Sequence, residues 1–233
     1  MRLSALYRIV VVALAVLASG PLPAFARPAG QEAIWEQSFP ADGLTTLSVD
    51  TLNGSIAVEA WDSPEVAARV IIGAGLPPGP ETRRRIDATR IVPRQDGSAL
   101  RLEVQAPTPA SDSVSADFTL RVPRALALEL RTASGTVNVT GVAAPLSLSS
   151  SNGSIAVYNA PGPMQVETAN GSVAVTLPAG AGAQLDLVTA NGQISVPGSG
   201  GGTSRQVRNT LGGGGPLVQV RTGSGSIAIS QGP

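Results

Sequence analysis

The sequence predicts an all-β fold, a β-solenoid or β-helix-like stack of short repeats, and three observations lead to it. One eight-residue motif recurs six times along the chain. Apolar and polar residues alternate on both sides of each copy, which is the period of a half-buried strand. Only 3% of the residues are aromatic against 42% that are hydrophobic, so the core must be built from Val, Ile, Leu and Ala.

Each copy reads Thr or Ser, any residue, Asn or Ser, Gly, a polar residue, Ile or Val, any residue, and Val or Ile. The copies span residues 51–58, 132–139, 150–157, 168–175, 189–196 and 222–229. Their glycines are Gly54, Gly135, Gly153, Gly171, Gly192 and Gly225, and the last five are spaced by 18, 18, 21 and 33 residues. We expect these structural glycines to take the φ > 0 position of a tight turn.

Two architectures fit the repeat. In an antiparallel meander, each Asn-Gly pair is the tip of a two-residue hairpin. In a solenoid, each unit is one coil, and equivalent residues stack along the axis one strand spacing apart. Thr, Asn and Ser recur at the same motif positions, and stacking rewards such ladders whereas a meander does not need them. The repetition therefore favours the solenoid.

The region between the first and second copies lacks the motif but keeps the strand period, most clearly over residues 114–122. Asp96-Gly97 marks the turn of a hairpin over residues 89–104. Residues 80–88 form either one short helix or an extended loop. We expect aromatic side chains of the N-terminal half to close one end of the stack, as terminal repeats must. They are Trp35, Phe39, Trp61 and Phe118.

The first 26 residues have the pattern of a secretory signal peptide. Two arginines precede an uninterrupted apolar run over residues 9–18, and Ala24-Phe25-Ala26 supplies small residues at both positions that a signal peptidase recognises. The apolar run is short for a membrane span of about 20 residues. We predict one repeat-built domain over residues 27–233, exported to the periplasm or the cell exterior, with no transmembrane segment after signal removal.

Composition excludes several kinds of chemistry. The chain has 16 basic and 16 acidic residues, every basic residue is Arg, and His, Lys and Cys are absent. Catalysis by Cys or His, Cys/His zinc sites, disulfides and lysine Schiff bases are therefore impossible. The balanced charge argues against a nucleic-acid partner, which needs a basic excess. We expect no catalytic residue, no metal site and no cofactor.

The repeats resemble the bacterial putative adhesin family, a domain of unknown function with Ser/Asn-Gly-x-Ile repeats, and are similar to the head domain of putative auto-transporter adhesins. The lead-in over residues 43–58 and the ending over residues 211–227 carry the likeness, which covers residues 33–230. The resemblance implies a β-helix-like fold in an exported protein and supplies no catalytic residues. We expect a non-enzymatic, structural or adhesin-like role at the cell envelope, with an envelope polymer or surface protein as partner.

A basic segment supports an alternative function. Arg83, Arg84, Arg85 and Arg90, followed by Arg94 and Arg101, offer a binding site for an anionic envelope component. Acidic residues are interleaved with these arginines, and a charged, solvated face explains the segment equally well. The glycine run over residues 212–215 lacks the lysine and helix of a phosphate loop and is interpreted as a connecting loop.

Two acidic residues support a third hypothesis, that the protein is a carbohydrate-active enzyme. Glu167 and Asp186 are the only acids after residue 130, and they occupy successive units with the same strand parity. A glycosidase needs two carboxyl groups that flank the scissile bond. Solvated outward positions among polar neighbours explain both residues without any enzymatic role, and this interpretation is favoured.

The signal peptide makes a prediction about the exported protein. Because Ala24-Phe25-Ala26 ends the apolar leader, the protein recovered from the periplasm or the medium should begin at Arg27. Intact-mass measurement of the recovered chain checks this. A full-length product confined to the cytoplasm would contradict it.

Overall fold

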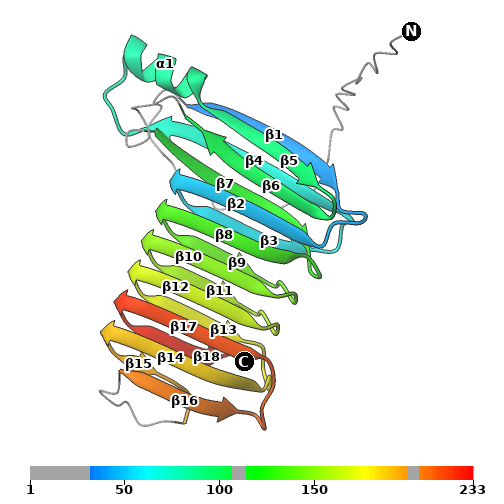
Figure 1. The fold of residues 1–233 in the computed structure, drawn as a ribbon, viewed down its shortest axis with the longest axis vertical. Coiled ribbons are helices and arrows are strands. Elements are labelled where there is room, and N and C mark those ends of the chain that lie inside the picture. The colour runs from blue at the N-terminus through cyan, green and yellow to red at the C-terminus, as the bar shows by residue number, and fades with distance from the viewer. Residues whose placement is uncertain (1–31, 107–113, 199–204, 233) are drawn as a thin grey trace.

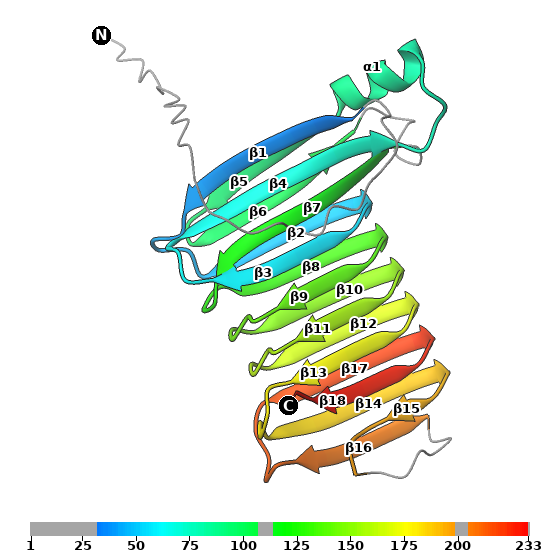
Figure 2. The ribbon, with the colours of Figure 1, turned by 180° about the vertical axis from the view of Figure 1, so that it is seen from behind.

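The computed structural model describes residues 32–106, 114–198 and 205–232, and it consists of two nine-stranded β-sheets with one short helix. Figures 1 and 2 show the sheets as the two walls of a flattened stack, with the helix at the N-terminal end. Aliphatic side chains from both sheets fill the space between the walls. The all-β prediction is confirmed. The predicted signal peptide lies outside the described residues.

Both sheets mix parallel and antiparallel strands. In spatial order, sheet A contains β1 (Ala33–Pro40), β4 (Glu65–Ala74), β7 (Val114–Pro123), β3 (Ile56–Trp61), β9 (Val137–Thr140), β11 (Ile155–Tyr158), β13 (Val173–Leu177), β18 (Ile227–Gln231) and β15 (Ile194–Ser195). Sheet B contains β16 (Gln206–Leu211), β14 (Ala183–Asn191), β17 (Leu217–Ser224), β12 (Met164–Asn170), β10 (Leu146–Asn152), β8 (Ala127–Ser134), β2 (Thr46–Asn53), β6 (Ala99–Gln105) and β5 (Arg90–Asp96). Helix α1 (Pro80–Ala88) connects β4 to β5. No helix in the described ranges has the length and apolar character needed to cross a membrane.

Each motif copy joins a strand of sheet B to a strand of sheet A, so one copy is one coil. Neighbouring coils pair in parallel and in register, with Asn152 opposite Asn170 and Ile155 opposite Val173. Asn170 Nδ2 donates a hydrogen bond to Asn152 Oδ1 at 3.1 Å. Equivalent residues thus lie one strand spacing apart, as in solenoid coils. The antiparallel meander is wrong for the repeats.

The spatial order of the coils departs from the chain order near the C-terminal end. β17 pairs with β12 on one side and with β14 on the other, while β18 lies between β13 and β15. The last motif copy is therefore inserted between the fourth and the fifth. The long spacing before this copy accommodates β16, which pairs antiparallel with β14 at the edge of sheet B.

The motif glycines stack so closely that no side chain fits. A Cβ on Gly153 would lie 1.9 Å from the carbonyl oxygen of Gly135, and one on Gly171 would lie 2.2 Å from that of Gly153. A positive φ is found at only three of the six, namely Gly54, Gly135 and Gly225. The expectation of φ > 0 is therefore wrong for Gly153, Gly171 and Gly192, where close approach of the neighbouring coil is what requires glycine.

The first residue of each motif is buried, and in five of the coils its hydroxyl binds a glycine carbonyl of the neighbouring coil. Thr132 Oγ1 donates to the Gly54 oxygen at 3.1 Å. The same bond recurs from Ser150 to Gly135, Thr168 to Gly153, Thr222 to Gly171 and Thr189 to Gly225. A buried hydroxyl left without a partner costs about 1–3 kcal/mol, and these bonds avoid that cost. Because each bond joins two neighbouring coils, the series also fixes the distance between them.

Antiparallel strands close both ends of the parallel stack. At the N-terminal end, β4 and β1 follow β7, and β5 and β6 form the predicted hairpin. Phe118 is buried there, and Trp35, Phe39 and Trp61 are half-buried. The indole N–H of Trp61 donates to the Glu65 carbonyl oxygen at 2.8 Å. The turn ladder begins at β7, where a carboxylate oxygen of Asp117 accepts a hydrogen bond from the Ser55 N–H at 2.8 Å.

Replacement of one stacked glycine tests this spacing constraint. Gly153→Ala places a methyl group against the Gly135 carbonyl, so the two coils must separate. We expect the free energy of unfolding to fall by about 3 kcal/mol or more. Urea denaturation measures it. Gly75→Ala is the matched control, because a Cβ there meets nothing within 4 Å, and its effect should stay within about 0.5 kcal/mol. Equal effects at the two positions would contradict the constraint.

Candidate functional site

The arginines proposed as anion-binding residues lie on or just after α1, at the N-terminal end of the stack (Figure 1). The helix has a proline at its start, where the missing N–H sacrifices no helical hydrogen bond. Ile86 is its buried apolar contact. Two hydroxyls fasten its ends, since Thr82 donates to the Pro77 carbonyl oxygen at 2.7 Å and Thr89 to that of Arg85 at 2.9 Å. The helix thus holds the arginines on a fixed, outward surface.

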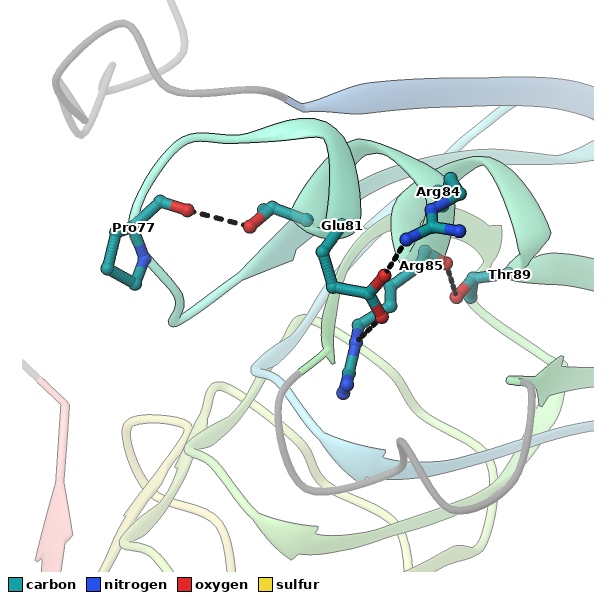
Figure 3. Close-up of polar contacts among 6 residues, drawn as sticks. Pro77, Glu81, Arg84, Arg85 and Thr89 are labelled. Carbon is teal, nitrogen blue, oxygen red and sulfur yellow. Dashed lines mark hydrogen bonds and ion pairs between the residues drawn. The ribbon is translucent and has the colours of Figure 1, made fainter.

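Two acidic residues of the same helix pair with its three arginines. Arg83 pairs with Asp87 at 2.8 Å and Arg85 with Glu81 at 2.9 Å. Arg84 contacts the same carboxylate, so Figure 3 shows both Arg84 and Arg85 directed at Glu81. The hydrogen bond from Arg85 and the charge of Arg84 lower the pKa of Glu81, and the hydrogen bond to Asp87 raises the pKa of Arg83.

The remaining arginines of the basic segment also have partners. Arg90 donates to the carbonyl oxygens of Asp87 and Thr89, the latter at 3.0 Å. Arg94 and Arg101 both lie near one carboxylate, that of Glu103, at 3.7 and 3.3 Å. The structure therefore brings the predicted residues together, but an anion must compete with carboxylates already in place.

Glu167 and Asp186 lie on the outer face of sheet B without being neighbours. β17 runs between β12, which carries Glu167, and β14, which carries Asp186. Glu167 is opposite Arg221 of β17, whereas Asp186 is opposite Gln219, two residues away. Two strand spacings and this offset separate the two Cα atoms by about 12 Å. Glu167 and Asp186 are in successive motif copies but are not close together, because the last coil is inserted between those copies.

Each of these acids has its own cationic partner. Asp186 accepts hydrogen bonds from Arg208 and from Gln219, both at 3.3 Å. These two bonds, Arg208 first, lower the pKa of Asp186. Glu167 lies 3.7 Å from Arg221. The two carboxylates are thus held in separate ion pairs, and neither is directed at a common point.

A shallow hollow that the sequence analysis missed crosses β10, β12 and β17 on the outer face of sheet B. Its volume is about 540 Å³, and its outward lining residues are Ser149, Ser151, Glu167, Ala169, Arg221 and Gly223. The signal was present in the motif, whose second residue is small in all three of these copies. The hollow offers hydroxyls and one ion pair. Within the described residues, no three acidic side chains gather as metal ligands.

The outer face of sheet A carries no charge over four neighbouring strands. The outward residues of β9, β11, β13 and β18 are Asn138, Thr140, Ala156, Tyr158, Ala174, Thr176, Ala228 and Ser230. We name these eight residues the smooth face. Because the strands pair in register, the side chains form two straight rows with a spacing of about 4.8 Å. Tyr158, 47% exposed, is its largest side chain.

A family model described as Toastrack DUF4097 matches residues 38–230. No curated protein matches the chain.

Among solved structures, the chain is similar to a putative cell adhesion protein from Clostridium sporogenes, with a TM-score of 0.58 and 15% identity over 87% of this chain and 100% of that one. It is also similar to a putative adhesin from Bacteroides fragilis, with a TM-score of 0.35 and 10% identity over 84% and 97% of the two chains. At these identities the first likeness shows the fold alone, and the second score is too low to carry an argument.

The ion pair of Asp186 makes a prediction about pH. A carboxyl group whose folded-state pKa is lowered stabilises the fold above its ordinary pKa of 3.8, and this contribution is lost as the pH falls through the folded-state value. Because Arg208 is largely exposed, Asp186→Asn should cost less than about 1 kcal/mol at neutral pH. Urea denaturation from about pH 7 to about pH 3 measures the difference. It should shrink only below about pH 4, and growth of the difference on acidification would contradict the assignment.

Proposed function

Since this chain belongs to the Toastrack DUF4097 family, we propose that it is an exported, non-enzymatic protein with a structural or adhesin-like role at the cell envelope. The leader pattern of residues 1–26 supports export. The parallel coils support a solenoid scaffold that presents broad, regular faces. We also propose that its role is similar to that of the head domains of auto-transporter adhesins.

The smooth face is the observation that carries the adhesin-like role. A surface of methyl groups, hydroxyls, one amide and one phenol ring suits an uncharged partner, because contact there desolvates no ion. Its straight rows match an extended partner that lies across several strands. We therefore assign the smooth face as the contact surface and an envelope polymer or surface protein without charge at the contact as its partner.

The arrangement of the acids supports a role without catalysis. The paired carboxyl groups of glycosidases lie about 5–9.5 Å apart, whereas Glu167 and Asp186 lie on strands separated by β17. Their ion pairs with Arg221 and Arg208 hold them in different places. A carbohydrate-active site would need both pairs to open and the carboxylates to approach.

The alternative, recognition of an anionic component by the basic segment, is less well supported. Arg83, Arg84 and Arg85 are paired with the carboxylates of their own helix. Binding of an anion would then exchange one set of ion pairs for another, with little net gain at an exposed surface. The two routes differ in their response to salt, because contacts between exposed charges weaken as ions screen them.

Sedimentation with envelope fragments tests the proposal. Residues 27–233 are incubated with insoluble cell-envelope fragments of the producing bacterium, and the bound fraction is measured at about 0.05 M and about 0.5 M salt. Binding through the smooth face should change less than about twofold between these salts. Ala156→Arg with Ala174→Arg should weaken binding about tenfold or more, because two buried charges enter the contact.

Three variants serve as controls. Ser147→Arg places the same side chain on the outer face of sheet B, and Glu167→Gln with Asp186→Asn removes both candidate acids. Neither should alter binding, and the second should leave any activity unchanged. Loss of binding in Arg84→Ala together with steep salt dependence would favour the anionic partner. Loss of an activity in the acid variant at unchanged thermal stability would reveal an enzyme.

A further inference from the structure

The last coil of the described chain fills a slot made by two coils that precede it. β17 lies between β12 and β14, and β18 lies between β13 and β15. The walls of the slot are therefore complete in sequence before the coil that fills it. We infer that this coil, residues 217–231, exchanges between two copies of the chain, so that the coil of one copy occupies the slot of the other.

The slot recognises the coil through contacts that depend on the motif. On one wall, Thr222 Oγ1 donates to the Gly171 carbonyl oxygen at 2.9 Å, and the Gly171 N–H donates to Ser224 O at 2.9 Å. On the other wall, Thr189 Oγ1 donates to the Gly225 oxygen at 2.9 Å. The Gly225 N–H donates to Asn191 O at 2.8 Å. All of these groups are supplied identically by a second copy.

One connector attaches this coil to the rest of the described fold. Residues 212–216, four glycines and a proline, lead from β16 to β17. Gly212, Gly213 and Gly214 have φ of 55°, 81° and 98°, which only glycine adopts freely. The connector passes directly over the start of β14, where a Cβ on Gly182 would lie 2.0 Å from the Gly214 oxygen. Because glycine has access to more backbone torsions than any other residue, another path of this connector can lead the coil to the slot of a neighbouring copy.

Exchange leaves the strand pairings of the fold unchanged. In the exchanged pair, each copy of β17 and β18 has the same four neighbours, and only the path of the connector differs. An exchanged element of this kind forms a closed two-fold dimer. Whether a coil enters its own slot or another one while the slots are open is then decided by protein concentration.

Two single-cysteine variants test the exchange. Asn170→Cys marks the slot and Ser224→Cys marks the coil, and these two residues are paired across adjacent parallel strands, within the reach of a disulfide. The chain has no cysteine of its own. The two variants are unfolded, mixed in equal amounts, refolded together at high concentration and oxidised. We expect a disulfide-linked dimer that contains one of each variant, identified by intact mass.

Matched pairs make the result decisive. Asn152→Cys mixed with Asn170→Cys has the same strand-to-strand geometry between two coils that follow one another in the chain, and we expect about tenfold less mixed dimer there. Asn170→Cys with Ser224→Cys in one chain, refolded at low concentration, should close an internal disulfide and so show that both positions tolerate cysteine. Closure in that chain without mixed dimer above the control would overturn the exchange.

Discussion

The contact between glycines of successive turns sets the geometry of the whole stack. Each turn places the carbonyl oxygen of one glycine where the side chain of the next would stand. That oxygen accepts a hydrogen bond from a buried Thr or Ser hydroxyl, as between Thr168 and Gly153. Coils linked in this way can lie neither closer nor farther apart than one strand spacing, so sheet pairing, core packing and the straight rows of exposed side chains all follow from it.

The structure of each coil can be predicted from the sequence, because it depends on residues that are close together in the chain. The motif marks the turn, the period of two marks the inward face, and Asp96-Gly97 marks the one tight hairpin that the structure confirms between β5 and β6. The spatial order of the coils could not be predicted in this way, because it depends on which distant segments pair. Since the six motif copies share the same stacking residues, nothing local shows that β17 lies between β12 and β14 and not beyond β14. The only indication in the sequence was the 33-residue interval between Gly192 and Gly225, which is longer than the other spacings among the last five motif glycines.

The candidate sites were predictable to different extents for the same reason. Arg83, Arg84 and Arg85 are close in the chain, so helix α1 keeps them together along with the two acids that pair with them. Glu167 and Asp186 depend on which coils are neighbours, and the inserted coil separates them. The smooth face is formed by the second strand of each motif, and its Ala-rich position can be seen in the sequence. That these positions form one continuous uncharged surface follows only from the pairing of the strands.

The antiparallel strands at the two ends have a consequence for aggregation. A parallel stack held by backbone bonds is a template that another chain of the same sequence could extend without limit, as in cross-β fibrils. In sheet B, β5 runs against the direction of the coil strands at one edge, and β16 does so at the other. In sheet A, the edge strands β1 and β15 both run in the direction of the coil strands, and β15 has only two residues. A further coil needs a strand in each sheet, so the opposite polarity of both edges of sheet B limits the length of the stack.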